Sequence, residues 1–347
     1  MLTSLKRESF YLFGMGFRKK MIFKNHCLFG LEDQRVLVCF DEMKPVRILP
    51  GEYRVEIGDD AIWEDEAGVW IRKNGVVTMM TEGRVCLPDF SAYRHPAWMR
   101  ALLADILVSI VDGKPVPNPL VYGKPWYRDA AMMCMVLERT GNLHLVRDWI
   151  LSLDTPYDCN NKGCKEPDNL GQVLYMISLV GDDTHPLVKT IVEEAHRRTE
   201  NGHLTGLSDY APHPVYQTKW LKFGLKCLKL EDCWTVPDVE DDYADLFWMD
   251  GAAAGTGGHE ISVADELYPY LNVARAHRLG LSLKQEAPDA QAYPISWEKE
   301  ASEAAYDRNL PFLPGYAAER IGAPHTWHAA EQFLYLYDRC DERKSEE

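Results

Sequence analysis

Residues 125–133 carry the side chains that a protein uses to hold a sugar ring. Trp126 and Tyr127 lead directly into Arg128 and Asp129, which open an apolar stretch. An aromatic face takes the apolar C–H side of a pyranose, while a guanidinium and a carboxylate bridge its hydroxyls. We assign Asp129 to binding, because the adjacent Arg128 favours its charged form. The alternative is an ordinary helix N-terminus, in which Asp129 complements the helix dipole and Trp126 fills the core.

Similar clusters of polar and aromatic residues recur at the N-termini of later predicted helices, at intervals of roughly 40–60 residues. That interval is the length of a helical hairpin, so we expect an array of αα units whose openings share one concave pocket. Helix caps also concentrate Asp, Asn and Thr at such positions, but capping does not explain the accompanying tryptophans. The openings supply Glu166 and Asp168, then Gln217 and Trp220, then Glu266, and finally Trp327, His328 and Glu331.

Hydrolysis of a glycosidic bond needs two carboxyl groups, one protonated as general acid and the other acting as base or nucleophile. The predicted pocket offers Glu166, Asp168, Glu266 and Glu331 for these roles. We expect a helix dipole to lower the pKa of Asp168, while Glu166 lies farther from that field and keeps its proton more easily. The alternative is that Asp168 caps its helix and Glu166 is solvated.

The sequence predicts neither a cofactor nor a metal site. The glycine-rich residues 251–258 lack the Gly-Lys-Ser/Thr ending of a phosphate loop. His325, His328 and Glu331 share a helical face, but two histidines at this spacing need further ligands to hold a metal. We expect these histidines to bond sugar hydroxyls or to cap their helix. An acidic and aromatic run at 241–250 is typical of a solvated face, with a pocket wall as the alternative.

Charge and cysteine content limit the partners and the compartment. The net charge of −15 argues against nucleic acid and anionic membranes as partners, which leaves a neutral small-molecule carbohydrate favoured. The chain has nine cysteines and no Cys-x-x-Cys pair, and we interpret all nine as reduced thiols in a cytoplasmic protein. No apolar window reaches transmembrane length, and the N-terminal apolar run is too short for a signal peptide.

The local patterns predict two parts, a small antiparallel β domain at 1–90 and a helical domain at 91–347. Strands are expected at 35–40, 53–57 and 69–72, with a hairpin within 10–29. After residue 90 helical periodicity dominates and strand signals nearly vanish, so the fold class is mainly α, an α/α toroid of about nine helices. The predicted helices span 95–111, 126–139, 143–153, 168–180, 185–198, 215–229, 265–279, 297–306 and 327–339.

Short motifs in the helical part resemble the six-hairpin glycosidase superfamily, whose members carry an (α/α)6 toroid, often behind an N-terminal β domain. Residues 126–129 are similar to the Trp-x-Arg-Asp element of glucoamylase-like enzymes, in which the Arg and Asp grip hydroxyls of the innermost sugar. Residues 326–331 resemble the Trp-Ser-His-Ala element near the end of the same enzymes. The chain departs from that pattern in lacking the Trp-Glu-Glu stretch that supplies their acid.

These patterns together predict a glycoside hydrolase that cleaves a short neutral oligosaccharide. Two alternatives stay open. The first is a sugar epimerase or isomerase, in which His259, His325 or His328 moves a proton. The second is a carbohydrate-binding protein that retains residues 126–129 but has lost its acid–base pair.

Overall fold

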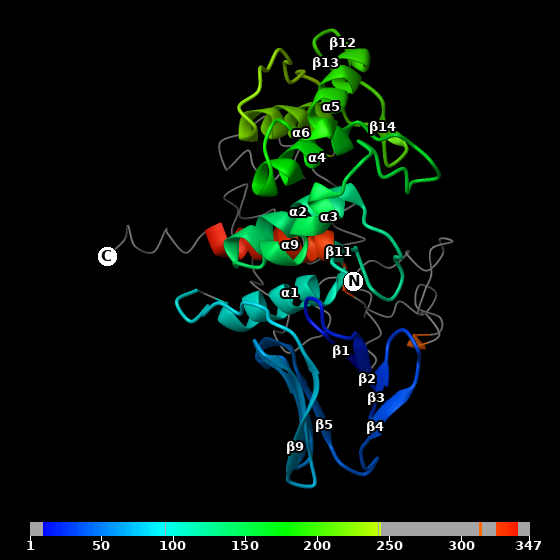
Figure 1. The fold of residues 1–347 in the computed structure, drawn as a ribbon, viewed down its shortest axis with the longest axis vertical. Helices are drawn as coiled ribbons and strands as arrows, with labels where there is room; N and C mark the ends of the chain where they lie inside the picture. The colour runs from blue at the N-terminus through cyan, green and yellow to red at the C-terminus, as the bar shows by residue number, and fades with distance from the viewer. Residues whose placement is uncertain (1–9, 94, 242, 244–311, 314–323, 339–347) are drawn as a thin grey trace.

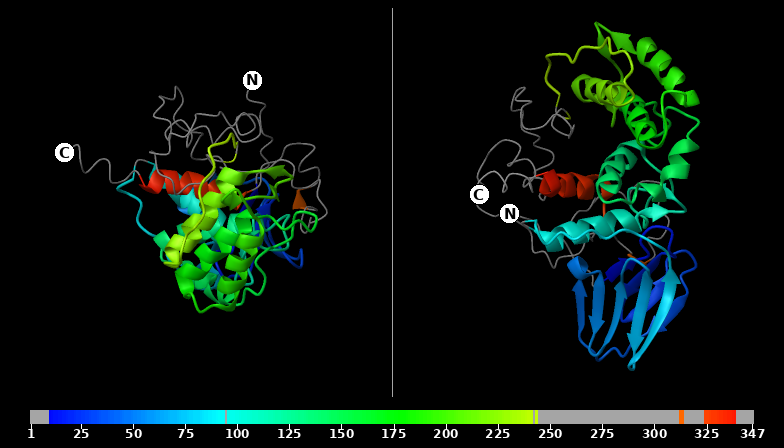
Figure 2. Two further views of the ribbon diagram at one scale, coloured as in Figure 1. Left: turned by 90° about the horizontal axis from the view of Figure 1, so that it is seen from above. Right: turned by 60° about the vertical axis from the view of Figure 1, so that its left-hand side comes forward.

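The computed structural model describes residues 10–93, 95–241, 243, 312–313 and 324–338. Two antiparallel sheets occupy residues 10–82, and helices are stacked above them (Figure 1). The two sheets form the base of the molecule, and the helices rise from it in an elongated column (Figure 2).

Both sheets are meanders in which each strand pairs with the next along the chain. Asn25 and His26, with φ of 51° and 58°, turn one hairpin, and Asn74 and Gly75, with φ of 52° and 78°, turn another. Left-handed residues of these types are typical of two-residue hairpin turns. The first sheet contains β1 (Phe10–Phe13), β2 (Met21–Lys24), β3 (Cys27–Gly30) and β4 (Val36–Cys39). The second contains β5 (Val46–Leu49), β6 (Arg54–Ile57), β7 (Asp60–Glu64), β8 (Gly68–Lys73) and β9 (Val76–Glu82).

The two sheets share one hydrophobic core. Val55, Ile62 and Ile71 point to it from one sheet, and Phe13 and Ile22 belong to it from the other. Along β6 the buried Val55 and Ile57 alternate with partly exposed residues, whereas every residue of β1 is buried. Residues 116–122, which come from the helical part of the chain, close this core from above.

The helices pack in an order that differs from their order in the sequence. The helix α9 (Thr326–Asp338) lies against both α1 (Pro96–Val108) and α2 (Tyr127–Arg139). In turn, α2 packs on α4 (Asp168–Val180), which packs on α6 (Pro214–Cys227). Two short elements, η2 (Leu143–Leu145) and α3 (Arg147–Leu151), precede α4, and both α3 and α5 (Pro186–Arg197) contact it.

The closest approach between helices occurs where α4 crosses α6. A Cβ added to Gly171 would lie 2.0 Å from the carbonyl carbon of Trp220, and one added to Gly224 would lie 2.6 Å from the Gly171 oxygen. Only glycine fits at this crossing, so the two backbones pack directly on each other.

The predicted α/α toroid is wrong. In the part of the chain described, the helices form a stack rather than a ring of inner and outer helices, and nine strands make the N-terminal part more than a small appendage. The hydrophobic periodicity correctly located the described helices, but an apolar face on a helix does not identify the helix that packs against it. The helices predicted at 265–279 and 297–306 lie outside the described residues. The division at residue 90 stays a prediction.

Strands after the first quarter of the chain, which the sequence analysis nearly excluded, do occur as three short hairpins. They are β10 (Ile110–Val111) with β11 (Lys114–Pro115), β12 (Thr199–Glu200) with β13 (His203–Leu204), and β14 (Leu207–Ser208) with β15 (Ala211–Pro212). Strands of two residues are too short to show an alternating pattern, which explains why they were missed.

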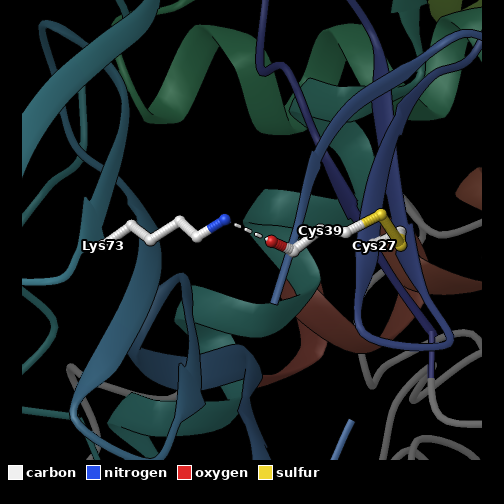
Figure 3. The surroundings of a disulfide bond; sticks show 3 residues. All are labelled: Cys27, Cys39 and Lys73. Carbon is white, nitrogen blue, oxygen red and sulfur yellow. Dashed lines mark hydrogen bonds between the residues drawn. A yellow bond between two sulfur atoms is a disulfide. The ribbon is translucent and has the colours of Figure 1, made fainter. Parts of the chain in front are cut away.

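The prediction that all nine cysteines are reduced is wrong for two of them. Cys27 and Cys39 lie opposite each other on β3 and β4 and form a disulfide (Figure 3). Lys73 of β8 donates a hydrogen bond of 2.6 Å to the Cys39 carbonyl, which links the two sheets at this point. The six other cysteines within the described ranges are free. None of the helices that the structure describes is long and apolar enough to cross a membrane.

Candidate functional site

Arg128, in the first turn of α2, is the centre of a buried polar cluster. Its side chain is 5% exposed. Nε and Nη2 lie 3.0 and 2.9 Å from Asp168 Oδ2, and Nη2 lies 3.6 Å from Glu166 Oε1. Nη1 donates to Asp209 Oδ2. One guanidinium therefore faces three carboxyl groups from two separate segments.

Asp168 has both carboxylate oxygens engaged within the protein. Its Oδ2 also accepts a hydrogen bond of 2.9 Å from Gln172 Nε2, one turn along α4. Its Oδ1 accepts from Ser208 Oγ, which is itself held at 3.0 Å by Gln217 Nε2. Because both oxygens bond to side chains of the protein, Asp168 is placed to position Arg128 rather than to bind a ligand.

Asp209 enters the cluster from the tip of the β14–β15 hairpin. Asp209 and Tyr210 form the two-residue turn, with φ of 47° and 67°. A tyrosine in the left-handed region is strained, and such strain is found preferentially at functional sites. The Asp209 side chain is 28% exposed, so this carboxylate is the one of the three that solvent reaches.

Glu166 is buried beside Asp209. Its Oε1 accepts hydrogen bonds from the Asp209 backbone N–H and from Asn161 Nδ2, the latter at 3.4 Å. The same Asn161 nitrogen lies 3.3 Å from Asp209 Oδ1, so the two carboxyls face each other across one amide. Burial raises the pKa of Glu166 to about 7; Arg128 opposes this rise, and the charges of Asp168 and Asp209 add to it. A proton on Glu166 relieves the repulsion among three carboxylates around one cation.

Two aromatic rings flank the guanidinium. The ring centres of Trp327 and Tyr243 lie 5.4 and 6.0 Å from the Arg128 Cζ atom. The Tyr243 hydroxyl donates a 3.0 Å hydrogen bond to Asp209 Oδ2. Tyr243 also stacks on His213, with ring centres 3.8 Å apart.

The expectation of a solvated face at 241–250 is wrong for Asp241, which is buried. Its Oδ2 accepts from the backbone N–H groups of Val215 and Tyr216 at the start of α6, at 2.9 and 3.0 Å. Its Oδ1 lies 3.0 Å from His213 Nδ1 and accepts from the Tyr243 N–H. Asp241 thus caps α6 and holds Tyr243 in the cluster.

A second polar group adjoins the first at the start of α9. His325 and His328 have ring centres 4.8 Å apart, and the Trp327 and His328 rings stack at 5.2 Å. Asp129 Oδ1 lies 3.7 Å from His325 Nε2, and Glu331 Oε2 lies 3.3 Å from His328 Nδ1. Burial, and then the neighbouring His325, lower the pKa of His328 well below its ordinary value, which leaves this imidazole neutral near pH 7.

Several predicted wall residues face other parts of the protein. Trp220 is fully buried among aromatic rings that include Tyr175 and Tyr216. The Tyr127 hydroxyl donates to the Thr155 carbonyl, and Trp126 packs edge-on against Tyr122. Glu266 and His259 lie outside the described residues.

Asp209, Asn161 and Tyr243 were not predicted as members of the site. Asp209 belongs to a hairpin too short for a periodic signal, and Asn161 lies in an irregular loop. The one usable signal was the acidic and aromatic mixture around Tyr243. Among the residues that the structure describes, no group of three or more His, Cys, Asp or Glu side chains is arranged to hold a metal ion.

Comparison with known proteins gives no relative from which a function could be transferred. The chain matches no family model, no curated protein and no solved structure. The function is therefore argued from the Arg128 cluster itself.

Proposed function

We propose that the Arg128 cluster is the active site of a glycoside hydrolase that acts on a short neutral oligosaccharide. One observation carries this proposal: a buried carboxyl with a pKa of about 7, Glu166, faces a solvent-accessible carboxylate, Asp209. Two carboxyls with different proton affinities are the minimal apparatus for breaking a glycosidic bond.

In the proposed reaction Glu166 donates its proton to the glycosidic oxygen as the bond to the anomeric carbon breaks. Asp209 attacks the anomeric carbon, and a water molecule then displaces it while Glu166, now charged, takes the proton of that water. The contact of both carboxyls with one Asn161 amide supports this retaining course, because retention needs carboxyls only ~5–5.5 Å apart. Arg128 and Asp168 act as positioning residues for the pair.

The surrounding rings supply the proposed sugar contacts. Trp327 and Tyr243 offer aromatic surface next to the carboxyls. His328 stacks on Trp327, and His325 lies between His328 and Asp129. Aromatic stacking combined with buried polar groups suits a pyranose, which has apolar faces and a polar rim.

The test is incubation of the purified protein with a panel of neutral oligosaccharides, with products separated by chromatography. Wild type is expected to release a smaller sugar, and Glu166→Gln and Asp209→Asn are each expected to lower the rate by ~10²-fold or more. The matched control is Asp183→Asn, because Asp183 is an exposed carboxylate on the loop before α5. Release of sugar at an unchanged rate by both site variants excludes the proposal.

A second candidate function is supported by the His325–His328 pair. A neutral buried imidazole can remove a proton from a sugar carbon, which is the chemistry of an epimerase or isomerase. That activity incorporates solvent deuterium into free sugars without cleavage of any bond between sugars. Loss of the incorporation in His328→Gln, with Glu166→Gln unaffected, favours it over hydrolysis.

The compartment stays a prediction. The sequence analysis predicted a cytoplasmic protein, whereas the Cys27–Cys39 pair requires an oxidising environment to persist. Mass spectrometry of alkylated protein from its native source shows whether this pair is oxidised there, which a reducing cytoplasm disfavours.

A further inference from the structure

The outer face of the five-stranded sheet carries a row of large side chains that the fold buries only in part. In the strand register, Arg54 lies opposite Trp63, Trp63 opposite Trp70, and Trp70 opposite Met79. The row therefore crosses β6, β7, β8 and β9 on one face. Val55, Ile62 and Ile71, each adjacent in sequence to a residue of the row, point to the core on the other face.

The two tryptophans form a parallel pair that stays partly exposed. Their ring planes are 12° apart and the ring centres are separated by 6.3 Å. The Arg54 guanidinium lies 5.8 Å from the Trp63 ring centre, and Met79 at the other end is 39% exposed. Neighbouring strands are ~4.8 Å apart, so this row is about 14 Å wide, enough for a short segment of polymer.

This face carries more basic than acidic side chains although the whole chain is acidic. Arg47, Arg54 and Arg72 share the face with two acids. Glu56 lies 3.3 Å from Arg47 Nη1 and 3.4 Å from Arg54 Nε, and Glu82 lies opposite Gly68 at the end of β9. The Arg47 side chain remains 67% exposed. Three guanidiniums against two carboxylates leave a small excess of positive charge on this face of a molecule of net charge −15.

We propose that this face, the Trp63–Trp70 face, binds an acidic polysaccharide built from uronic acid units. The parallel indole rings stack on the apolar faces of successive sugars, and the arginines pair with their carboxylates in the forked geometry that guanidinium favours. Neutral glycans lack the carboxylates with which the three arginines can pair. The proposal does not depend on the chemistry at Arg128, because the two groups share no residue.

The test is a calorimetric and tryptophan-fluorescence titration of the full chain with a size-defined oligogalacturonate, in the Glu166→Gln background. That background removes the proposed acid of the Arg128 cluster, so the result is independent of hydrolysis there. We expect binding that weakens as salt is added, and a loss of about tenfold in affinity for each of Trp63→Leu and Trp70→Leu. The leucine variants keep apolar volume while removing the stacking surface, and Val36→Thr on the other sheet, 57% exposed, is the matched control.

A charge variant keeps the proposal testable if either leucine variant fails to fold. Arg54→Gln with Arg72→Gln is expected to lower affinity for the oligogalacturonate at low salt and to leave circular dichroism unchanged. Failure of oligogalacturonate to bind, equal affinity for a neutral galacto-oligosaccharide, or equal affinity in the folded tryptophan and arginine variants overturns the proposal.

Discussion

Arg128 shows how much of the candidate site depends on a single buried charge. It contacts Glu166, Asp168 and Asp209 at once, and it is almost fully buried. A buried ion pair contributes little relative to an apolar core, but losing one partner leaves an uncompensated charge in a poorly solvated place. The geometry also requires a fork, because Nε and Nη2 both reach the same Asp168 oxygen.

We therefore expect Arg128→Lys to lower the free energy of unfolding by about 2–3 kcal/mol, since lysine keeps the charge and loses the fork. Urea unfolding followed by circular dichroism measures this. Arg147→Lys is the matched control: Arg147 is 55% exposed and its pair with Asp148 is solvated, so its effect is expected to stay within about 0.5 kcal/mol. Equal stability of the Arg128 variant and the control contradicts the central role of Arg128.

Glu166 predicts a dependence of stability on pH that can be measured without a substrate. Its pKa is about 7 in the folded protein against an ordinary value of 4.5, so the folded state keeps a proton that the unfolded state releases. The contribution of Glu166 to stability is therefore greatest below pH 4.5 and falls as the pH rises through about 7. The total fall is about 3 kcal/mol.

The measurement compares the free energy of unfolding of wild type and Glu166→Gln across this pH range. The difference between them isolates Glu166 from the other titrating groups. The free energy of unfolding of wild type is expected to decrease relative to that of the variant as the pH increases. A difference that stays constant from about pH 4.5 to about pH 8 shows that Glu166 titrates normally.

The sequence analysis identified some residues of the Arg128 cluster and missed others. Arg128, Asp168 and Glu166 stood at predicted helix openings, and the structure brings them together. Asp209 could not be found, because a two-residue turn between strands of two residues leaves no pattern in the sequence. The tryptophan at 220 was predicted for the pocket and lies in the core, since tryptophan marks burial as readily as ligand contact.

At the level of elements, the crossing of α4 and α6 fixes the positions of Asp168 and Gln217, which lie near the start of these two helices. Gly171→Ala is expected to cost about 3 kcal/mol or to prevent folding, because the added methyl group meets the backbone at Trp220. Thermal unfolding measures the change.

The control for this variant is Gly181→Ala at the end of the same helix. Its nearest neighbour to an added Cβ is the Ile177 oxygen at 3.5 Å, an ordinary contact, and its φ is −138°. A nearly neutral effect at 181 together with a large one at 171 attributes the loss to the helix crossing. Similar effects at both glycines refute that attribution.

The β3–β4 hairpin is expected to depend on its disulfide. The bond closes a loop with a sequence separation of 12, and its removal costs about 3 kcal/mol by the loop-entropy relation. Urea unfolding of wild type is expected to shift to lower midpoint when a reductant is added. The double variant Cys27→Ser, Cys39→Ser is expected to have the low midpoint with or without reductant. A wild-type midpoint that does not change when reductant is added contradicts the presence of the bond.

Helix locations followed from the sequence to within a few residues, because each described helix has an apolar face of helical period. Their arrangement did not follow. The contact of α9 with both α1 and α2 joins segments about 200 residues apart, and periodicity contains no information about such partners. The toroid was inferred from the spacing of helix openings, and a stack of helices has the same spacing.

For the molecule as a whole, the sheets and the helices form one connected structure. Glu64 of β7 accepts hydrogen bonds from the Gly14 and Met15 N–H groups and from Arg18, while the Gly16 N–H donates to the Leu107 carbonyl of α1. At the site end, the Thr326 N–H at the start of α9 donates to the Pro117 carbonyl. Its neighbour Val116 belongs to the core of the sheets. The sheets therefore help to position α9, which carries Trp327 and His328.

The most direct test of the proposed hydrolase is the pH dependence of kcat/KM for the oligosaccharide that the panel identifies. If protonated Glu166 is the general acid, kcat/KM of wild type falls as the pH rises through about 7, and Glu166→Gln loses this descending limb together with most of the rate. A wild-type profile that stays flat through this region, or a descending limb that persists in Glu166→Gln, contradicts the assignment of Glu166 as the acid.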